Sequence, residues 1–187
     1  MVTEQIIEKF IAAARLVGTE VCSLTSLAEA ADYIAERLTG TLLLPVFSSS
    51  QRHGLVKTLT AAGIEVEESL SRETAPGAQG GLTGVNFAMA DTGTLALEST
   101  AEDIRLATTL PEIQFALLDP EKILADSLLA VEPMRQLHQR DPRNYIAYVT
   151  GPSRTADIDR VLTIGVHGPK QLHVLLVPNL SNDPLEM

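Results

Sequence analysis

The first part of the chain carries apolar residues at helical spacing. Over residues 3–17 the apolar positions are Ile6, Ile7, Phe10, Ile11, Ala14 and Val17. This spacing predicts an amphipathic helix. A second helix is predicted over residues 26–40, because Ser26 and Glu29 have capping-box spacing ahead of another apolar stripe. The N-terminal segment, about residues 1–40, is therefore expected to be helical.

From residue 41 the pattern changes to short apolar runs separated by turn residues. The run at 41–47 (TLLLPVF) is typical of a buried strand, and the three serines after it favour a helix start. That helix is expected to reach about Ala62, and the alternation in IEVEE (64–68) predicts a second strand. A strand, a helix and a strand in this order form a β-α-β unit with a parallel pair, which places the chain in the α/β class.

The middle of the chain combines a turn-rich stretch with a locally specified hairpin. Residues 71–81 (SRETAPGAQGG) have little apolar content and several residues that bend the chain, which predicts a loop. Residues 85–97 (VNFAMADTGTLAL) alternate apolar and polar positions around Asp91-Thr92-Gly93. This pattern predicts a β-hairpin in which Gly93 adopts the left-handed conformation.

The last third is predicted to repeat the β-α-β pattern. Strands are expected at 113–118, 145–150 and 172–177. A helix over 121–139, interrupted near Pro133, and a short helix from the turn GPSRTAD to about Leu162 are expected between them. The prediction is one domain over 1–187, with an α/β core of about 41–187 after the helical segment.

Composition narrows the classes of function. A chain of 187 residues with 45% hydrophobic residues can build one buried core. Its 24 acidic and 14 basic residues give a formal net charge of −10, so a nucleic-acid backbone would be repelled. The N-terminus lacks a basic region followed by an apolar core, and no apolar run reaches the roughly 18 residues that span a bilayer. A cytoplasmic protein without a membrane span is expected.

Cys22 is the single cysteine. One thiol excludes an intrachain disulfide and an all-cysteine cluster, since iron-sulfur clusters usually take four thiolates. No cofactor, and in particular no iron-sulfur cluster, is therefore expected in this chain. Cys22 itself has two interpretations, a nucleophile or a small apolar residue of the core, and the second is favoured because buried thiols are usually inert.

Two turns have the residue types that bind ligands. The triplet at Asp91 matches the signature of aspartic proteases, but those enzymes need two copies and this chain has one. The GPSRTAD turn follows a predicted strand, and Gly151, Ser153, Arg154 and Thr155 could hold an anion there. The alternative, that Ser153 or Thr155 only caps a helix, is equally compatible with the sequence.

Other polar residues give weaker signals. His167 lies between small residues and titrates near neutral pH, but the spacing of His53, His138 and His173 from it fits no metal motif, so no metal is expected. Glu98 offers a general base close to the Asp91 turn. Ser99 and Glu102 have capping-box spacing, which favours a structural role for that acidic cluster. The candidate catalytic residues are thus Asp91, Glu98 and His167.

Four blocks together resemble a known family. They are LTGVNFAMADTGTLALES (82–99), RLATTLP (105–111), GPSRTADIDRVLTIGVHGP (151–169) and LHVLLV (172–177). Their order and spacing are similar to the lactate-utilization (LUD) domain family, in its short, cluster-free form known as lactate utilization protein C. The resemblance covers most of the chain from about residue 41. It implies a three-layer, Rossmann-like, mostly parallel sheet flanked by helices, similar to ribose-phosphate isomerases, glucosamine-phosphate deaminases and CoA-transferases.

The resemblance implies participation in the bacterial oxidation of L-lactate to pyruvate, beside iron-sulfur partner proteins. Some relatives have a histidine where this chain has Gln114, so no proton transfer is assigned to that position. Two hypotheses remain open: an accessory subunit of a lactate-oxidizing assembly, or an enzyme or binding protein for a phosphorylated, nucleotide-like or carboxylate molecule. For the second, Thr92, Gly93 and Thr94 are expected to face the GPSRTAD turn across a cleft.

Overall fold

The computed structural model describes residues 4–140, 143–156 and 162–187. The helices in these ranges are α1 (Glu4–Leu16), α2 (Leu27–Ala35), α3 (Ser48–Arg52), α4 (Leu55–Ala61), α5 (Glu102–Thr109) and α6 (Val131–Arg140), with short 3₁₀ turns η1 (Ala75–Gly77) and η2 (Pro120–Lys122). The strands are β1 (Glu20–Ser23), β2 (Leu42–Leu43), β3 (Val66–Glu67), β4 (Gly80–Gly84), β5 (Phe87–Met89), β6 (Thr94–Glu98), β7 (Ile113–Leu118), β8 (Ile123–Leu124), β9 (Ile146–Val149), β10 (Arg154–Ala156), β11 (Leu162–Ile164) and β12 (Gln171–Leu176).

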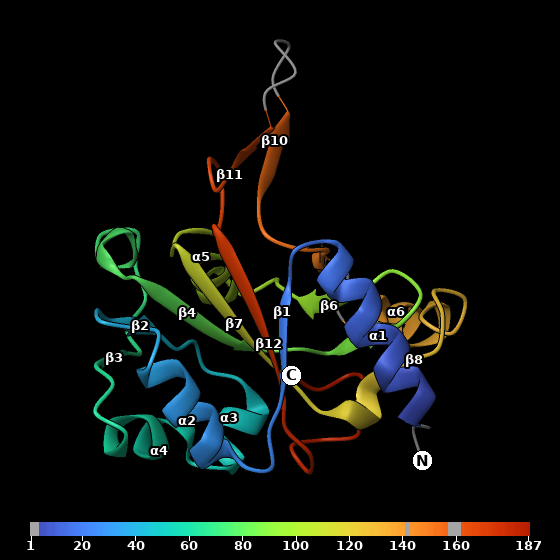
Figure 1. Cartoon of the computed structure of the whole chain (residues 1–187), viewed down its shortest axis with the longest axis horizontal. Helices are drawn as coiled ribbons and strands as arrows, with labels where there is room; N and C mark the ends of the chain where they lie inside the picture. The colour runs from blue at the N-terminus through green and yellow to red at the C-terminus, as the bar shows by residue number, and fades with distance from the viewer. Residues whose placement is uncertain (1–3, 141–142, 157–161) are drawn as a thin grey trace.

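The main sheet has six strands in the order β1-β12-β7-β4-β2-β3, and every neighbouring pair is parallel. Successive residues of a strand point to opposite faces. A side chain at Gly80 would meet Leu38, just after α2, whereas one at Gly81 would meet the backbone of Ala107 in α5. Helices therefore cover both faces, with α2 and α4 on one side and α5 on the other (Figure 1). The predicted three-layer α/β arrangement around a mostly parallel sheet is confirmed.

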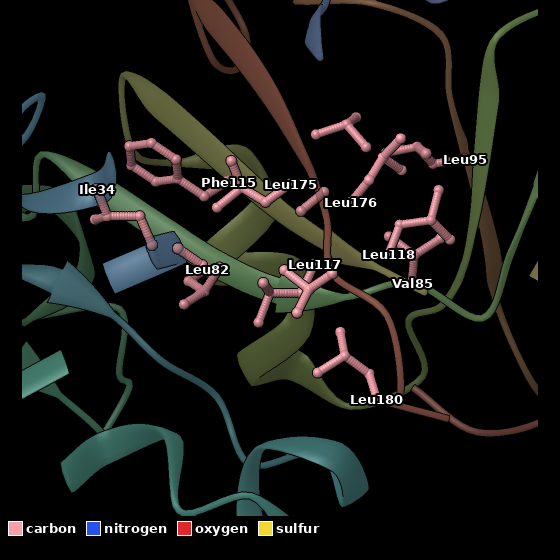
Figure 2. Packing of buried hydrophobic residues seen from close by; sticks show 14 of the residues in the cluster. Ile34, Leu82, Val85, Leu95, Phe115, Leu117, Leu118, Leu175, Leu176 and Leu180 are labelled. Atoms are coloured by element: carbon pink, nitrogen blue, oxygen red, sulfur yellow. The ribbon is translucent and has the colours of Figure 1, made fainter. Parts of the chain in front are cut away.

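The core is built around the central strands of this sheet, which are buried on both faces. All six residues of β7 are buried, and β12 is buried from Leu172 onward, which is typical of strands in the middle of a parallel sheet. Phe115, Leu117 and Leu175 of these strands pack with Ile34 of α2 in one apolar cluster (Figure 2). The same cluster includes Leu95 of β6, so the main sheet and the second sheet share a core.

The second sheet has the order β8-β5-β6-β9 and contains the predicted hairpin. Strands β5 and β6 are antiparallel, and Gly93 in their turn has φ 66°, as the sequence predicts. Helix α6 covers this sheet through Leu137, which packs with Phe87 and Met89. Helix α1 contacts both β1 and β8 and so bridges the two sheets (Figure 1). Within the described residues, no helix has the length and apolar character needed to cross a bilayer.

Two of the predicted boundaries are wrong in the first half. The segment expected to be helical, about 1–40, contains β1, which pairs with β12 at one edge of the main sheet. The loop expected over 71–81 ends early, because β4 begins at Gly80 and all five of its residues are buried. Gly81 is needed there, since a Cβ atom would lie 1.9 Å from the carbonyl oxygen of Ala107.

The second half departs from the predicted helices. Instead of one helix over 121–139, the chain forms η2 and β8, and α6 starts at Val131. Pro133 lies in the first turn of α6, where the absent N–H costs no helical hydrogen bond. The helix predicted after the GPSRTAD turn is replaced at Arg154–Ala156 by β10, which pairs antiparallel with β11. This hairpin projects from the body of the molecule (Figure 1). The expected second β-α-β unit is also wrong, because β9 pairs antiparallel with β6.

Candidate functional site

The carboxyl ends of the parallel strands lie along one edge of the main sheet, and a polar residue follows several of them. Ser48 comes after β2, Asn86 after β4, Asp119 after β7 and Ser181 after β12. In open α/β sheets, ligands bind at this edge, because the loops that leave neighbouring strands converge there. The carboxyl edge is therefore where a ligand site is expected.

A cleft of about 570 Å³ opens at the carboxyl edge. Its polar lining residues are Ser48, Arg52, Asn86, Glu98, Arg140, Asn144, Asp183 and Glu186. Phe47, Ile104 and Met187 supply part of its apolar wall. Volumes of roughly 300–1,000 Å³ with an apolar wall and a few polar groups are usual for sites that bind small molecules. This carboxyl-edge cleft is the first candidate for a ligand.

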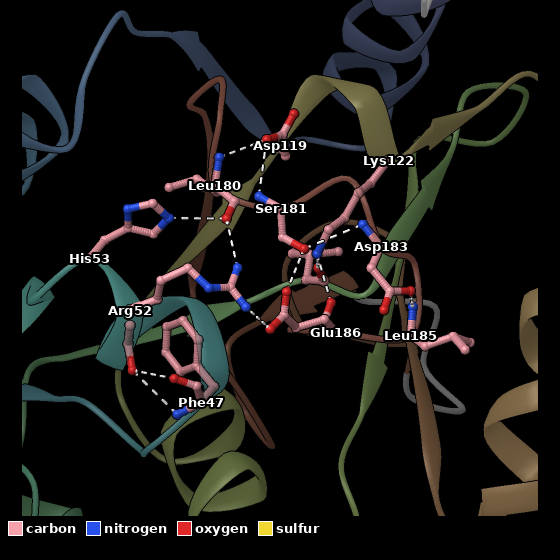
Figure 3. Close-up of polar contacts among 12 residues, drawn as sticks. Phe47, Arg52, His53, Asp119, Lys122, Leu180, Ser181, Asp183, Leu185 and Glu186 are labelled. Carbon is pink, nitrogen blue, oxygen red and sulfur yellow. Dashed lines mark hydrogen bonds and ion pairs between the residues drawn. The ribbon is translucent and has the colours of Figure 1, made fainter.

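One wall of the cleft is the C-terminal segment, residues 180–187, and Asp119 holds its start. The Asp119 carboxylate is buried and accepts the N–H groups of Leu180 at 2.7 Å and Ser181 at 3.2 Å. Its other oxygen accepts the N–H of Glu121 at 3.0 Å. A buried carboxylate with three N–H donors is well compensated, so the first residues of the segment are tied to the end of β7 (Figure 3).

Arg52 of α3 holds the segment from the side of the cleft. Its guanidinium donates to the carbonyl oxygen of Leu180 at 3.3 Å and forms an ion pair with Glu186. The hydroxyl of Ser181 donates to the same carboxylate at 2.6 Å. The hydrogen bond from Arg52, and after it the one from Ser181, hold the pKa of Glu186 below its ordinary value. Contact with Glu186 likewise raises the pKa of Arg52 (Figure 3).

Lys122 lies beneath the C-terminal segment and is not among the residues that line the cleft. It is 4% exposed, and its ammonium group donates to the carbonyl oxygens of Val85 at 2.9 Å and Glu186 at 2.6 Å. No carboxylate of the described chain lies within 4.0 Å of its Nζ atom. Burial therefore lowers the pKa of Lys122 to about 8. At neutral pH this is a buried cation, and close to pH 8 it can exchange a proton.

Comparison with known proteins assigns the family. The family model of the LUD domain matches residues 7–177. The chain belongs to the LUD domain family. A crystal structure of a DUF162 family protein from Deinococcus radiodurans superimposes with a TM-score of 0.68 at 22% identity, over 92% of this chain and 96% of that one. That likeness shows a shared fold.

Curated relatives match this LUD domain over part of their own length. An uncharacterized protein of Neisseria meningitidis serogroup B is 36% identical over 52% of this chain and 41% of that protein. Lactate utilization protein B of Bacillus subtilis is 32% identical over 53% of this chain and 20% of its own. Lactate utilization protein C of Bacillus pumilus is 27% identical over 71% and 55%. The chain thus spans between 20% and 55% of these relatives.

The anion-binding turn predicted from the sequence lies at the opposite, amino, edge of the LUD domain sheet. Gly151 approaches the chain just before β1, since a Cβ atom on it would lie 2.3 Å from the carbonyl oxygen of Val17. The N–H of Ser153 donates to the carbonyl oxygen of Pro169, just before β12, at 2.9 Å. Arg154 and Thr155 belong to β10, opposite Ile164 and Thr163. Asp157 lies outside the described residues.

One residue of the Asp91 hairpin, Thr94, lies next to Thr150, the residue before the predicted anion-binding turn. The hydroxyl groups of Thr94 and Thr150 are 2.8 Å apart, at the ends of the paired strands β6 and β9. Gly93 faces α1, however, because a Cβ atom on it would lie 2.4 Å from the amide nitrogen of Ala14. Thr92 and Asp91 are exposed, and the Asp91 carboxylate accepts the N–H of Ser127 at 3.0 Å. The Asp91 turn thus connects the hairpin to neighbouring segments.

The other two candidate catalytic residues, Glu98 and His167, lie at opposite edges of the main sheet. Glu98 lines the carboxyl-edge cleft, where its carboxylate accepts the N–H of Thr100 at 2.9 Å. Exposed His167 lies in a pocket of about 500 Å³ that also contains Glu112 and Lys170, which form an ion pair at 2.6 Å. The predicted cap at Ser99 is wrong, because its hydroxyl donates to Tyr145 and Ala101 is the N-cap of α5. In the described ranges, no three His, Cys, Asp or Glu side chains gather as a metal site would require.

Proposed function

We propose that this protein takes part in the utilization of L-lactate, as an accessory component that acts beside iron-sulfur partner proteins. The observation that carries this proposal is the LUD domain match over residues 7–177, together with relatives named lactate utilization proteins B and C. The single cysteine supports it: Cys22 is partly exposed on the edge strand β1, and one thiolate is too few for a conventional cluster. Electron transfer from lactate to an acceptor would then take place in the partners.

Deletion of the gene in its own host tests this role. We expect growth on L-lactate as the carbon source to be lost and growth on pyruvate to be unchanged, because pyruvate enters metabolism after the oxidation step. The wild-type gene on a plasmid should restore growth on lactate. Equal growth of the deletion strain and its parent on lactate would overturn the proposal. Native purification of the tagged protein should also recover iron-containing proteins.

A second candidate function is the binding of a small carboxylate or phosphate molecule in the carboxyl-edge cleft. Arg52 and Arg140 face this cleft from two different helices. Guanidinium groups bind carboxylate and phosphate through paired hydrogen bonds that are stronger than those between neutral groups. Asn86 and Asn144 add polar atoms that can fix the orientation of a ligand. Glu98 would be the general base if the ligand is also converted.

Calorimetry with matched arginine variants tests this second function. Inorganic phosphate, L-lactate, pyruvate, nucleotides and CoA are titrated against wild type, Arg52→Ala, Arg140→Ala and Arg154→Ala. Arg135→Ala serves as the control, because Arg135 pairs with Glu132 on the surface of α6. Loss of binding in the Arg52 and Arg140 variants would support the cleft. Loss in Arg154→Ala alone would support the amino-edge turn instead, and the absence of binding to wild type would reject both sites.

A further inference from the structure

The C-terminal segment places its oxygen atoms on the cationic groups of the carboxyl edge. The contacts are Arg140 to the carbonyl oxygen of Leu185 at 2.6 Å, Lys122 to that of Glu186 at 2.6 Å, Arg52 to the Glu186 carboxylate, and the N–H of Ser49 to the carbonyl oxygen of Met187 at 3.1 Å. A bound organic acid would present the same kind of atoms to these groups. The segment thus occupies the positions where ligand oxygens would be expected.

Lys122 is a buried cation that the segment contacts only through a neutral oxygen. Its two hydrogen-bond partners are neutral carbonyl oxygens, although the ammonium group is almost fully buried. Buried charges are usually paired with an opposite charge, because carbonyl dipoles compensate only part of the lost hydration. The carboxylates of Asp119, Glu186 and Asp183 act on Lys122 only from beyond 4.0 Å. A ligand carboxylate in the place of the Glu186 carbonyl would add a counter-charge in direct contact. The buried ammonium group therefore favours an anion in direct contact over the neutral carbonyl oxygen of Glu186 that now fills this position.

The segment is fixed at its start by Asp119, contacts cations along its middle, and buries Met187 in the main apolar cluster at its far end. Asp119 holds the N–H groups of Leu180 and Ser181, and Asn179 just before them has φ 64°, a conformation that most residues avoid. Residues 182–187 belong to no helix or strand. At the far end, Met187 lies against Gly84, where a Cβ atom would be 2.7 Å from its Cγ atom. Displacing the segment beyond Ser181 would therefore break no strand pairing, although it would expose Met187.

We propose that residues 182–187 are an internal stand-in for a small organic acid, and that a carboxylate ligand displaces them to reach Lys122 together with Arg52 and Arg140. This inference rests on the second function proposed above, binding in the carboxyl-edge cleft, and adds a third cation and a closing segment to that site. A ligand shifts such an equilibrium only through a difference in affinity for the two states. Here the ligand binds the open state more tightly, because only in that state can its carboxylate contact the Lys122 ammonium group.

Two opened variants test the inference: a chain that ends at Ser181, and full-length Gly84→Ala, in which the added methyl group displaces Met187. Pyruvate is the probe, with inorganic phosphate as a second arm. We expect both variants to bind pyruvate about tenfold more tightly than wild type, equivalent to about 1.4 kcal/mol, because the closed population no longer competes. A second readout is the rate of Lys122 acetylation at pH 8, divided by that of exposed Lys57 in the same molecule. This ratio should be about tenfold higher in the opened variants than in wild type, and pyruvate should lower it again. Thermal unfolding of each variant verifies that it is folded.

Hydrogen exchange of the wild-type protein provides the decisive comparison. Pyruvate should increase deuterium uptake in residues 182–187, whereas a ligand that binds beside a closed segment would leave uptake unchanged or lower it. Equal affinity in all variants with unchanged uptake would overturn the inference and leave the cleft proposal standing. If neither wild type nor the opened variants bind any of the anions titrated above, the cleft proposal itself fails. Unchanged acetylation of Lys122 in both opened variants would show that the segment does not control access to it.

Discussion

Gly93 is restricted to glycine for two separable reasons. Its φ of 66° disfavours any side chain, and a Cβ atom would lie 2.4 Å from the backbone of Ala14. We expect Gly93→Ala to lower the free energy of unfolding by more than about 1 kcal/mol. Gly54→Ala is the matched control, because Gly54 has φ 61° and a Cβ atom there would meet no other atom within 4 Å. Urea unfolding should show a clearly smaller loss for the control, and equal losses would contradict the contact with α1.

Lys122 should make stability depend on pH. Its pKa falls from 10.5 to about 8 in the folded protein, first because of burial. Between these values the unfolded chain binds more protons than the folded chain, so stability rises with pH. The cost of the buried charge is full below about pH 8 and disappears toward pH 10.5. Across this window, the free energy of unfolding of wild type should rise relative to that of Lys122→Met by up to about 1.4 kcal/mol per pH unit.

Urea unfolding of both proteins at intervals from about pH 7 to about pH 10.5 measures this difference. The control pair is wild type against Lys57→Met, since Lys57 is exposed on α4. The difference in free energy of unfolding between wild type and Lys57→Met should not change with pH over the same range. Parallel curves for wild type and Lys122→Met would show that the ammonium group is hydrated in the folded protein.

At the scale of elements, the hydroxyl pair Thr94 and Thr150 joins the ends of β6 and β9. A double-mutant cycle with Thr94→Val and Thr150→Val should give a coupling energy of about 0.5–1.5 kcal/mol, the usual net value of a hydrogen bond. Chemical unfolding of the two single variants and the double variant supplies the numbers. Additive losses would mean that the pair contributes nothing, and that the two blocks are held only by strand pairing.

The elements that can be predicted from the sequence are those whose signal is local. Helices α1 and α2, strands β7 and β12 and the β5–β6 hairpin each carry their apolar pattern within one stretch of chain. Strand β4 cannot be found in this way, because Gly80 and Gly81 are typical of a bending chain until the approach of α5 is known. Strand β1 spans only Glu20–Ser23 and depends on a partner far along the chain.

The candidate site is only partly predictable for the same reason. Glu98 ends the second strand of a recognisable hairpin. Arg52, Lys122 and Asp119, in contrast, each resemble an ordinary polar residue near the start of a helix or turn. Parallel register brings their segments to one edge, and no spacing in the sequence encodes that convergence. Lysine is rarely buried, so the sequence around Lys122 does not indicate its position under the C-terminal segment.

At the scale of the whole molecule, the single cysteine limits the redox chemistry of the chain. We expect purified protein to contain no stoichiometric iron or sulfide after anaerobic cluster reconstitution, because one thiolate cannot hold a conventional cluster. Iron and sulfide assays provide the measurement, and cluster-level amounts would refute the expectation. The isolated protein should also fail to oxidize L-lactate with an artificial electron acceptor, and robust turnover would contradict the accessory role.

The pairing of β1 with β12 also constrains how the protein folds during synthesis. Val21 of β1 stands opposite Val174 of β12, so β1 cannot pair until β12 has been synthesised. Contacts this distant in sequence are slow to form, because the entropy cost of closing a long loop comes before the favourable hydrogen bonds between the strands. Strand β1 therefore leaves the ribosome without its sheet partner. This edge of the main sheet is completed only when β12 has been translated, and until then α1 and β1 depend on other contacts to avoid aggregation.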